Sequence, residues 1–112
     1  MLANNQSRPN DDANTELVRG DLVLNTLSRS VAFANQSVLN LTVTEFNMLH
    51  ALVLRPGNVI TYERFAQVTH SSVVEKNTIS AHIKNLKKKI KRAAPEFNGI
   101  DSEYGLGYRW KV

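Results

Sequence analysis

The chain has 112 residues, 42% of them hydrophobic and 21% charged, which is typical of one globular domain rather than of a disordered or fibrous chain. It contains no cysteine, so disulfides, thiolate zinc sites and cysteine nucleophiles are excluded. No apolar run approaches the roughly 18 to 20 residues that span a bilayer, and the first residues lack the hydrophobic segment of a signal peptide. We therefore expect a cytoplasmic protein that has no contact with a membrane.

The first 15 residues are polar, contain the Asp11-Asp12 pair and offer almost nothing to bury. Such a composition predicts a flexible linker or tail over 1–15, which leaves 16–112 as the folded domain. Apolar residues then alternate with a period of two around Leu22–Leu24 and Val31–Phe33, and Val38-Leu39 follow a polar break. This pattern predicts three short strands in a small antiparallel sheet.

Two helices are predicted next. Thr42 and Glu45 have the spacing of a capping box, and Pro56-Gly57 end the helix that they begin. The buried face of this first helix is predicted to contain Phe46, Leu49, His50 and Val53. After the short apolar link Val59-Ile60, Thr61 caps a second helix, whose buried side is predicted to be Tyr62, Phe65 and Val68.

A third helix is predicted from about residue 75 to 93, with a second possible capping box at Ser72–Glu75 and Pro95 as its stop. Its apolar residues form one narrow stripe, namely Ile79, Ile83, Leu86 and Ile90. The segment 100–112 then reads as a hairpin that turns at Tyr104–Gly107. We expect Tyr108 and Trp110 to brace this hairpin against the core and Tyr104 to be exposed. The order of the elements predicts an α+β fold.

The positive charge is concentrated in the third helix. The formal net charge is +4, but the window from Lys76 to Arg92 holds seven basic residues and no acidic one. Unpaired cations on one element are typical of a protein that binds a polyanion, because the cations repel each other unless an external anion compensates them. The alternative is a solvated, lysine-rich helix face without a partner.

The amino-terminal half of the third helix carries small, mostly neutral side chains: Asn77, Thr78, Ala81, His82 and Asn85. Groups of this kind can read base edges in a major groove. Lysines such as Lys84 and Lys88 can reach phosphates, which fix the register of a helix on DNA without carrying sequence information. An α-helix fits the major groove of B-DNA but not that of A-form RNA, so the pattern favours double-stranded DNA.

Four segments in this order resemble the carboxy-terminal effector domains of OmpR/PhoB-type response regulators. They are Gly20–Leu24, Leu41–Phe46, Thr78–Ile90 and Gly105–Arg109. The resemblance covers about Leu17 to Val112. It implies a winged helix-turn-helix fold with a four-stranded amino-terminal sheet, three helices of which the third is the recognition helix, and a carboxy-terminal hairpin as the wing.

The resemblance also implies a function, a partner and a set of contact residues. Family members regulate transcription in two-component systems, bind promoter DNA, typically as tandem pairs on direct repeats, and often touch RNA polymerase through the loop that here spans 68–74. Carried over by position, the DNA-facing residues of the helix are Asn77, Thr78, Ala81, His82, Lys84, Asn85 and Lys87. The tip of the wing falls at Tyr104 and Gly105.

The chain departs from many relatives at several of these positions. Asn77 and Asn85 stand where arginines are common, and since asparagine prefers adenine where arginine prefers guanine, we expect an A·T-rich target. Tyr104 stands where a wing arginine often enters the minor groove, so the wing is expected to pack on sugar and phosphate. No receiver domain precedes residue 16, which leaves two readings: an excised effector domain or an orphan regulator.

Two other classes of protein were weighed. A winged-helix module that binds proteins and no DNA is the main alternative, since function does not follow from fold. An enzyme is not expected, because the chain has no glycine-rich phosphate loop, nucleophile elbow or paired carboxylates on one element. The three histidines are not spaced closely with carboxylates, so neither a metal site nor a cofactor is expected. His82 could contact DNA or be a structural residue, and His50 is expected to be a core histidine.

Overall fold

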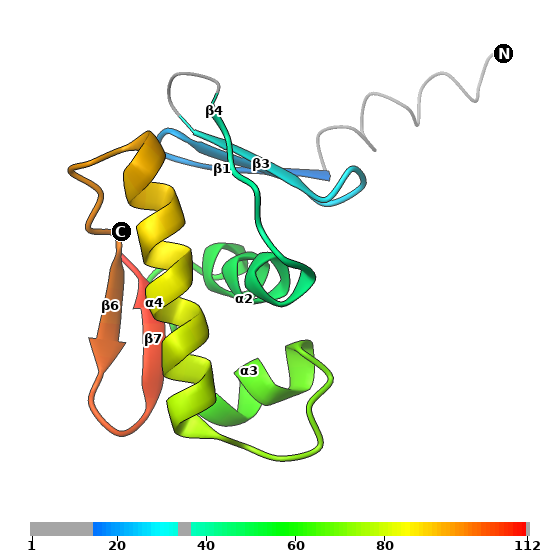
Figure 1. Cartoon of the computed structure of the whole chain (residues 1–112), viewed down its shortest axis with the longest axis vertical. Helices are drawn as coiled ribbons and strands as arrows, with labels where there is room; N and C mark the ends of the chain where they lie inside the picture. The colour runs from blue at the N-terminus through cyan, green and yellow to red at the C-terminus, as the bar shows by residue number, and fades with distance from the viewer. Residues whose placement is uncertain (1–14, 34–36, 112) are drawn as a thin grey trace, which may run out of the picture.

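A four-stranded antiparallel sheet opens the computed structural model, which describes residues 15–33 and 37–111 (Figure 1). The strands pair in chain order, and they are β1 (Glu16–Arg19), β2 (Leu22–Asn25), β3 (Ser30–Phe33) and β4 (Ser37–Val38). The alternation in the sequence predicted only the last three. The pattern did not predict β1 because one of its two inward positions is charged: these positions are Leu17 and Arg19. The Arg19 Nε donates to the carbonyl oxygen of Val53 at 2.7 Å. The four strands implied by the family resemblance are confirmed.

Helix α2 (Val43–Leu54) follows the sheet and has the predicted cap. The Glu45 amide donates to the Thr42 hydroxyl at 3.1 Å, and the Thr42 amide donates to Glu45 Oε1 at 2.9 Å. Both halves of the capping box are therefore present. The core side of α2 is wider than predicted, since it also buries Met48 and Leu52, whereas His50 is only half-buried beside the Phe46 ring.

The segment predicted as an apolar link is strand β5 (Val59–Thr61), which leads directly into helix α3 (Tyr62–Val68). β5 pairs with the last strand of the chain, with Ile60 opposite Tyr108. The prediction of a link was wrong because two apolar residues carry no period, and the pairing partner lies almost fifty residues away. The predicted cap of α3 is confirmed, since the Arg64 amide donates to the Thr61 hydroxyl at 3.0 Å.

Helix α4 (Lys76–Ala93) is the longest element of the described chain. All four residues of its predicted apolar stripe are buried: Ile79, Ile83, Leu86 and Ile90. The second capping box is wrong. The helix begins after Glu75, whose side chain makes no capping hydrogen bond, and Ser71 instead closes a local turn by donating to the Val73 carbonyl at 2.7 Å.

The chain ends in the hairpin of β6 (Ile100–Glu103) and β7 (Gly107–Trp110), which joins β5 in a sheet of order β5-β7-β6. Tyr108 and Trp110 are buried, as predicted, and the Trp110 ring lies 5.4 Å from the Phe97 ring. Figure 1 shows α4 running alongside this hairpin, with the amino-terminal sheet at one end of the helix and the hairpin turn near the other. The architecture is the predicted winged helix-turn-helix.

Candidate nucleic-acid interface

One edge of α4 faces away from the core and carries most of the residues singled out in the sequence. Six of them are exposed, namely Asn77, Thr78, Ala81, Lys84, Asn85 and Lys88. His82 and Lys87 are half-buried and flank this edge. We call these eight residues the α4 edge. The narrow apolar stripe explains the arrangement, because four buried residues leave the rest of the helix surface to solvent.

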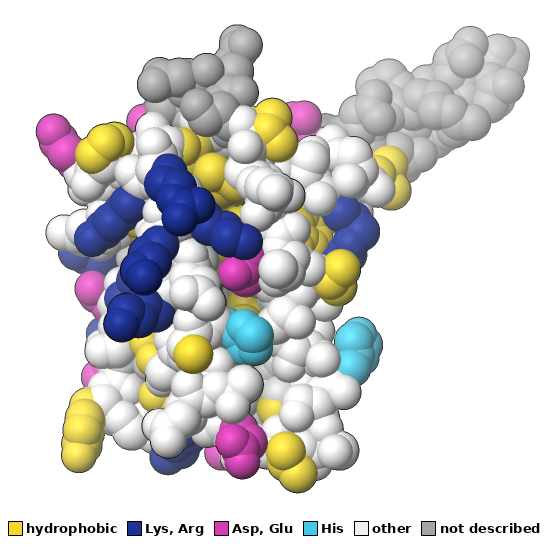
Figure 2. All heavy atoms as spheres, viewed as in Figure 1, with side chains coloured by type: hydrophobic (Ala, Val, Ile, Leu, Met, Phe, Trp, Pro, Cys, Tyr) yellow, Lys and Arg dark blue, Asp and Glu magenta, His cyan; other side chains and the backbone are white. Residues whose placement is uncertain are grey.

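The cations of α4 gather on the carboxy-terminal half of the helix, where dark blue side chains cluster in Figure 2. Lys84, Lys88, Lys91 and Arg92 are exposed, and none of them has an ion-pair partner among the described residues. The amino-terminal half presents short, uncharged side chains from Asn77, Thr78 and Ala81. The interface therefore has a neutral part and a cationic part along one helix, as the sequence predicted.

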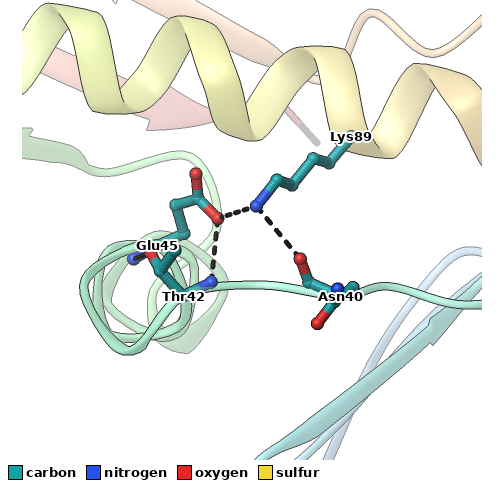
Figure 3. A network of polar contacts seen from close by, with 4 residues as sticks. All are labelled: Asn40, Thr42, Glu45 and Lys89. Carbon is teal, nitrogen blue, oxygen red and sulfur yellow. Dashed lines mark hydrogen bonds and ion pairs between the residues drawn. The ribbon is translucent and has the colours of Figure 1, made fainter.

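One lysine of this helix, Lys89, has an ion-pair partner within the fold. The Lys89 ammonium lies 2.6 Å from Glu45 Oε1 and donates to the carbonyl oxygen of Asn40 at 3.0 Å (Figure 3). The expectation that all cations of the third helix lack an internal anion is therefore wrong at this position. Sequence reasoning missed the pair because Glu45 already had a role in the capping box, and because 44 residues separate the partners.

Glu45 is only 3% exposed, so its ionisation depends on these partners. Burial by itself would raise the pKa of Glu45. The hydrogen bond from Lys89, the hydrogen bonds of Thr42 and the charge of Lys89 outweigh burial and hold that pKa below its ordinary value. The carboxylate is thus charged at neutral pH, and it joins the amino terminus of α2 to the carboxy-terminal half of α4.

A second contact fixes the other half of α4 to the hairpin. The Ser80 hydroxyl and the Tyr108 hydroxyl lie 2.7 Å apart, which joins the first turns of the helix to β7. Burial raises the pKa of Tyr108, so its phenol stays protonated and able to donate. The α4 edge and the wing are consequently held in one arrangement.

The tip of the wing projects fully into solvent. Tyr104 is 99% exposed, as expected from its place at the turn, and Gly105 beside it has a φ of 75°, which favours glycine. Leu106, also exposed, accepts a hydrogen bond from the Tyr62 amide through its carbonyl oxygen at 3.1 Å. The exposed ring and the neighbouring leucine give the wing an apolar tip, of which the sequence predicted only Tyr104.

The loop between α3 and α4 is the other exposed feature near the start of the helix. Val73 and Val74 are 59% and 45% exposed there, although both are apolar. These two neighbouring aliphatic side chains are available for contact with another molecule. His82 lies behind this loop, in a hollow that it shares with Met48 and Thr69.

Within 15–33 and 37–111, no group of three or more histidine, cysteine or acidic side chains could hold a metal ion. Nor does this part of the chain have a helix that is long and apolar enough to cross a bilayer.

Comparison with known proteins identifies the family to which this fold is similar. Residues 35–110 match the family model described as "Transcriptional regulatory protein, C terminal". The transcriptional regulatory protein BaeR of Escherichia coli is 38% identical over 77 residues, which are 67% of this chain and 32% of BaeR. The regulatory protein VanR of Enterococcus faecium is 31% identical over 96 residues, covering 83% of this chain and 41% of VanR. The chain thus spans less than half the length of these relatives.

Solved structures agree with this relationship. The DNA binding domain of CpxR from Escherichia coli superimposes with a TM-score of 0.75 at 27% identity, over 87% of this chain and 96% of that domain. The response regulator AdeR DNA binding domain, solved in complex with an intercistronic region, superimposes with a TM-score of 0.78 at 23% identity, over 86% of this chain and 99% of that one. This second likeness concerns the fold alone.

Proposed function

Since the chain belongs to the family of carboxy-terminal transcriptional regulatory domains, we propose that it binds double-stranded promoter DNA sequence-specifically and regulates transcription. The observation that carries this proposal is the α4 edge, in which lysines without an ion-pair partner in the described part of the chain continue an uncharged row of small side chains. A helix in the major groove needs these two kinds of group, one for phosphates and one for base edges. The family is not one of enzymes, and we propose no catalytic role.

We assign the contact residues by the chemistry of their side chains. Lys84, Lys87 and Lys88 would bind phosphates, and Tyr104 with Gly105 would pack against sugar and phosphate at the wing. The uncharged part of the α4 edge (Asn77, Thr78, Ala81, His82 and Asn85) would face base edges, with the asparagines favouring adenine and an A·T-rich site. Such a regulator would act in the cytoplasm, where the chromosome lies.

Two further partners are proposed with the DNA. The exposed Val73 and Val74 support a protein contact through the 68–74 loop, for which RNA polymerase is the candidate implied by the family. Tandem binding of two copies on a direct repeat is the oligomeric arrangement that we propose on DNA. The alternative function, a protein-binding module without DNA contact, would use the same exposed valines and would leave the lysines without a partner.

Salt dependence separates DNA binding from that alternative. Lys84→Ala and Lys88→Ala are each expected to weaken binding to all duplexes and to flatten the slope of log Kd against log salt by about one unit. Arg55→Ala is the matched control, because it removes one exposed positive charge at the end of α2 rather than on α4. Fluorescence anisotropy at several salt concentrations measures these slopes. An equal change in the Arg55→Ala protein would mean that the loss of binding is not specific to contacts made by α4.

Substitution of Asn85 tests sequence readout rather than charge. Asn85→Ala is expected to cost roughly 1 to 3 kcal/mol against the preferred site and much less against random DNA, because only the specific complex uses its amide. The preferred site comes first from selection of bound duplexes out of a random library. The ratio of specific to non-specific affinity is then compared between the two proteins, and an unchanged ratio would exclude base readout by Asn85.

A further inference from the structure

A cavity of about 250 Å³ lies among α2, β5 and α3, and basic side chains surround it. Its polar lining consists of Asn47, His50, Arg55, Arg64 and His70, with Ile60 and Val68 among the apolar residues. Among residues 15–33 and 37–111, no carboxylate lines it, and no residue of α4 does either. The cavity is therefore distinct from the proposed DNA interface and is lined by hydrogen-bond donors and positive charge.

Two arginines at this cavity differ from Arg19 and Arg109, which are engaged within the fold. Arg19 is bound to the Val53 carbonyl oxygen, and Arg109 is paired with Glu103. Arg55 and Arg64 at the cavity are exposed and have no ion-pair partner among the described residues. The Arg64 guanidinium only donates to the neutral Gln67 side chain at 3.2 Å, which leaves most of its donors available.

A third arginine stands behind the cavity and orients one of its walls. The Arg29 Nη2 donates to Asn47 Oδ1 at 2.7 Å, and its guanidinium carbon lies 4.5 Å from the centre of the Phe46 ring. Because Oδ1 is engaged as an acceptor, the Asn47 side chain has its Nδ2 donors left. The charge of Arg29 adds to that of Arg55 and Arg64, so this side of the molecule carries three cations around one cavity.

The backbone at His70 closes the carboxy-terminal end of α3 beside the cavity. His70 has a φ of 60° and is the position after α3 where glycine usually stands, with its amide donating to Gln67 and the Ser71 amide donating to Ala66. A residue with a side chain costs about 1 kcal/mol or more in this conformation. This turn places the His70 imidazole at the cavity.

The hydrogen-bond donors of this cavity require a ligand that offers hydrogen-bond acceptors. A guanidinium offers five donors and no acceptor, and its planar fork matches the oxygens of a phosphate. Burial first, and then the charge of Arg29, lower the pKa of His50, which favours its neutral imidazole. A bound anion would oppose the effect of Arg29 by compensating its charge, and it would favour the imidazolium directly.

We propose that this cavity binds the phosphate group of a small molecule, through Arg55, Arg64 and the Asn47 amide, with His50 and His70 at its walls. The site would add a ligand-binding function to the domain on elements other than α4. It does not depend on the proposed DNA binding.

The test uses inorganic pyrophosphate and the 112-residue chain, followed by NMR without DNA. We expect saturable shifts confined to amides of α2, β5, α3 and residue 70, together with an increase in the pKa of His50 read from its ring protons. The double variant Arg55→Ala/Arg64→Ala should bind pyrophosphate about tenfold more weakly or worse, since it loses charge-assisted hydrogen bonds. Circular dichroism verifies that the variant is folded. The Arg55→Lys/Arg64→Lys variant keeps both positive charges but lacks the planar guanidinium groups. Its affinity for pyrophosphate should lie between those of the parent chain and the double alanine variant.

The matched control is Lys84→Ala/Lys88→Ala, which removes two cations from α4 and should leave the pyrophosphate affinity unchanged. Equal weakening in both double variants, or shifts centred on α4, would overturn the proposal. A separate arm measures binding of random duplex DNA. If Arg55→Ala/Arg64→Ala weakens that binding as much as Lys84→Ala/Lys88→Ala does, the arginines serve the DNA backbone instead and the small-molecule site is wrong. If pyrophosphate binds as proposed while neither variant alters DNA binding, the cavity stands and the DNA interface falls.

Discussion

Gly107→Ala is expected to lower the free energy of unfolding of the domain by about 3 kcal/mol or more. A Cβ at residue 107 would lie 1.9 Å from the carbonyl oxygen of Ile60 and 3.0 Å from the Thr61 Cα. Both atoms belong to the backbone of β5, so no side-chain rotation relieves the overlap. The strands would have to separate where Thr61 is paired with Gly107, at the start of α3.

Urea unfolding measures this cost, and the chain provides a matched control two residues away. Gly105→Ala places its Cβ in open space, and only its φ of 75° opposes the new side chain, so we expect a loss of about 1 kcal/mol. The difference between the two variants isolates the close approach of β5 and β7. Equal stability of the two alanine variants would contradict the packing described here.

Lys89→Ala is expected to cost about 3 kcal/mol at neutral pH, because it leaves the Glu45 carboxylate buried without its countercharge. Lys88→Ala is the control, since Lys88 is the neighbouring lysine, exposed and without an ion-pair partner among the described residues, and its loss should change stability by less than about 0.5 kcal/mol. Thermal or urea unfolding of the two variants gives the comparison. Similar losses in both would mean that the Glu45–Lys89 contact does not stabilise the fold.

The pH dependence of the same variants has a definite sign. In the parent chain the pKa of Glu45 is lower in the folded state than its ordinary value of 4.5, so its contribution is complete above that value and is lost as the pH falls through the folded pKa. Without Lys89, only the hydrogen bonds of Thr42 oppose burial, so the pKa of Glu45 is higher than in the parent. The difference in stability between the parent and Lys89→Ala should therefore shrink as the pH is lowered below 4.5, the ordinary value. A difference that is constant from pH 7 to pH 3 would exclude the ionised pair as its cause.

Local patterns were sufficient to predict the helices of this fold. The stripe of Ile79, Ile83, Leu86 and Ile90 predicted both the length of α4 and its buried side, because a helix repeats within a few residues. The capping boxes show the limit of such patterns. Thr42 and Glu45 form theirs, whereas Ser72 and Glu75 do not, since Ser71 bonds within its own turn and the helix begins later.

What the sequence did not predict depends on contacts between distant segments. β5 is three residues long, and its strand pairing is defined only by residues 107–109. Lys89 resembles its exposed neighbours in the sequence, and only the position of α2 shows that it is an internal partner of Glu45. The cavity at His50 and His70 gave no signal either, because its walls come from α2, β5, α3 and the following loop. The assignment of the α4 edge to DNA contacts stays a prediction.

The two attachments of α4, through Ser80 to Tyr108 near its beginning and through Lys89 to Glu45 near its end, have a thermodynamic consequence. Because α4 is held near both ends, it has already lost most of its conformational entropy when the chain folds. Binding of a duplex therefore costs little additional conformational entropy in this helix. Conformational changes on binding are therefore expected in the DNA and in the ends of the lysine side chains. Calorimetry with duplexes of different stiffness should show that the free energy of binding becomes less favourable as the DNA becomes harder to bend. The heat-capacity change of binding should be too small to indicate folding of the protein.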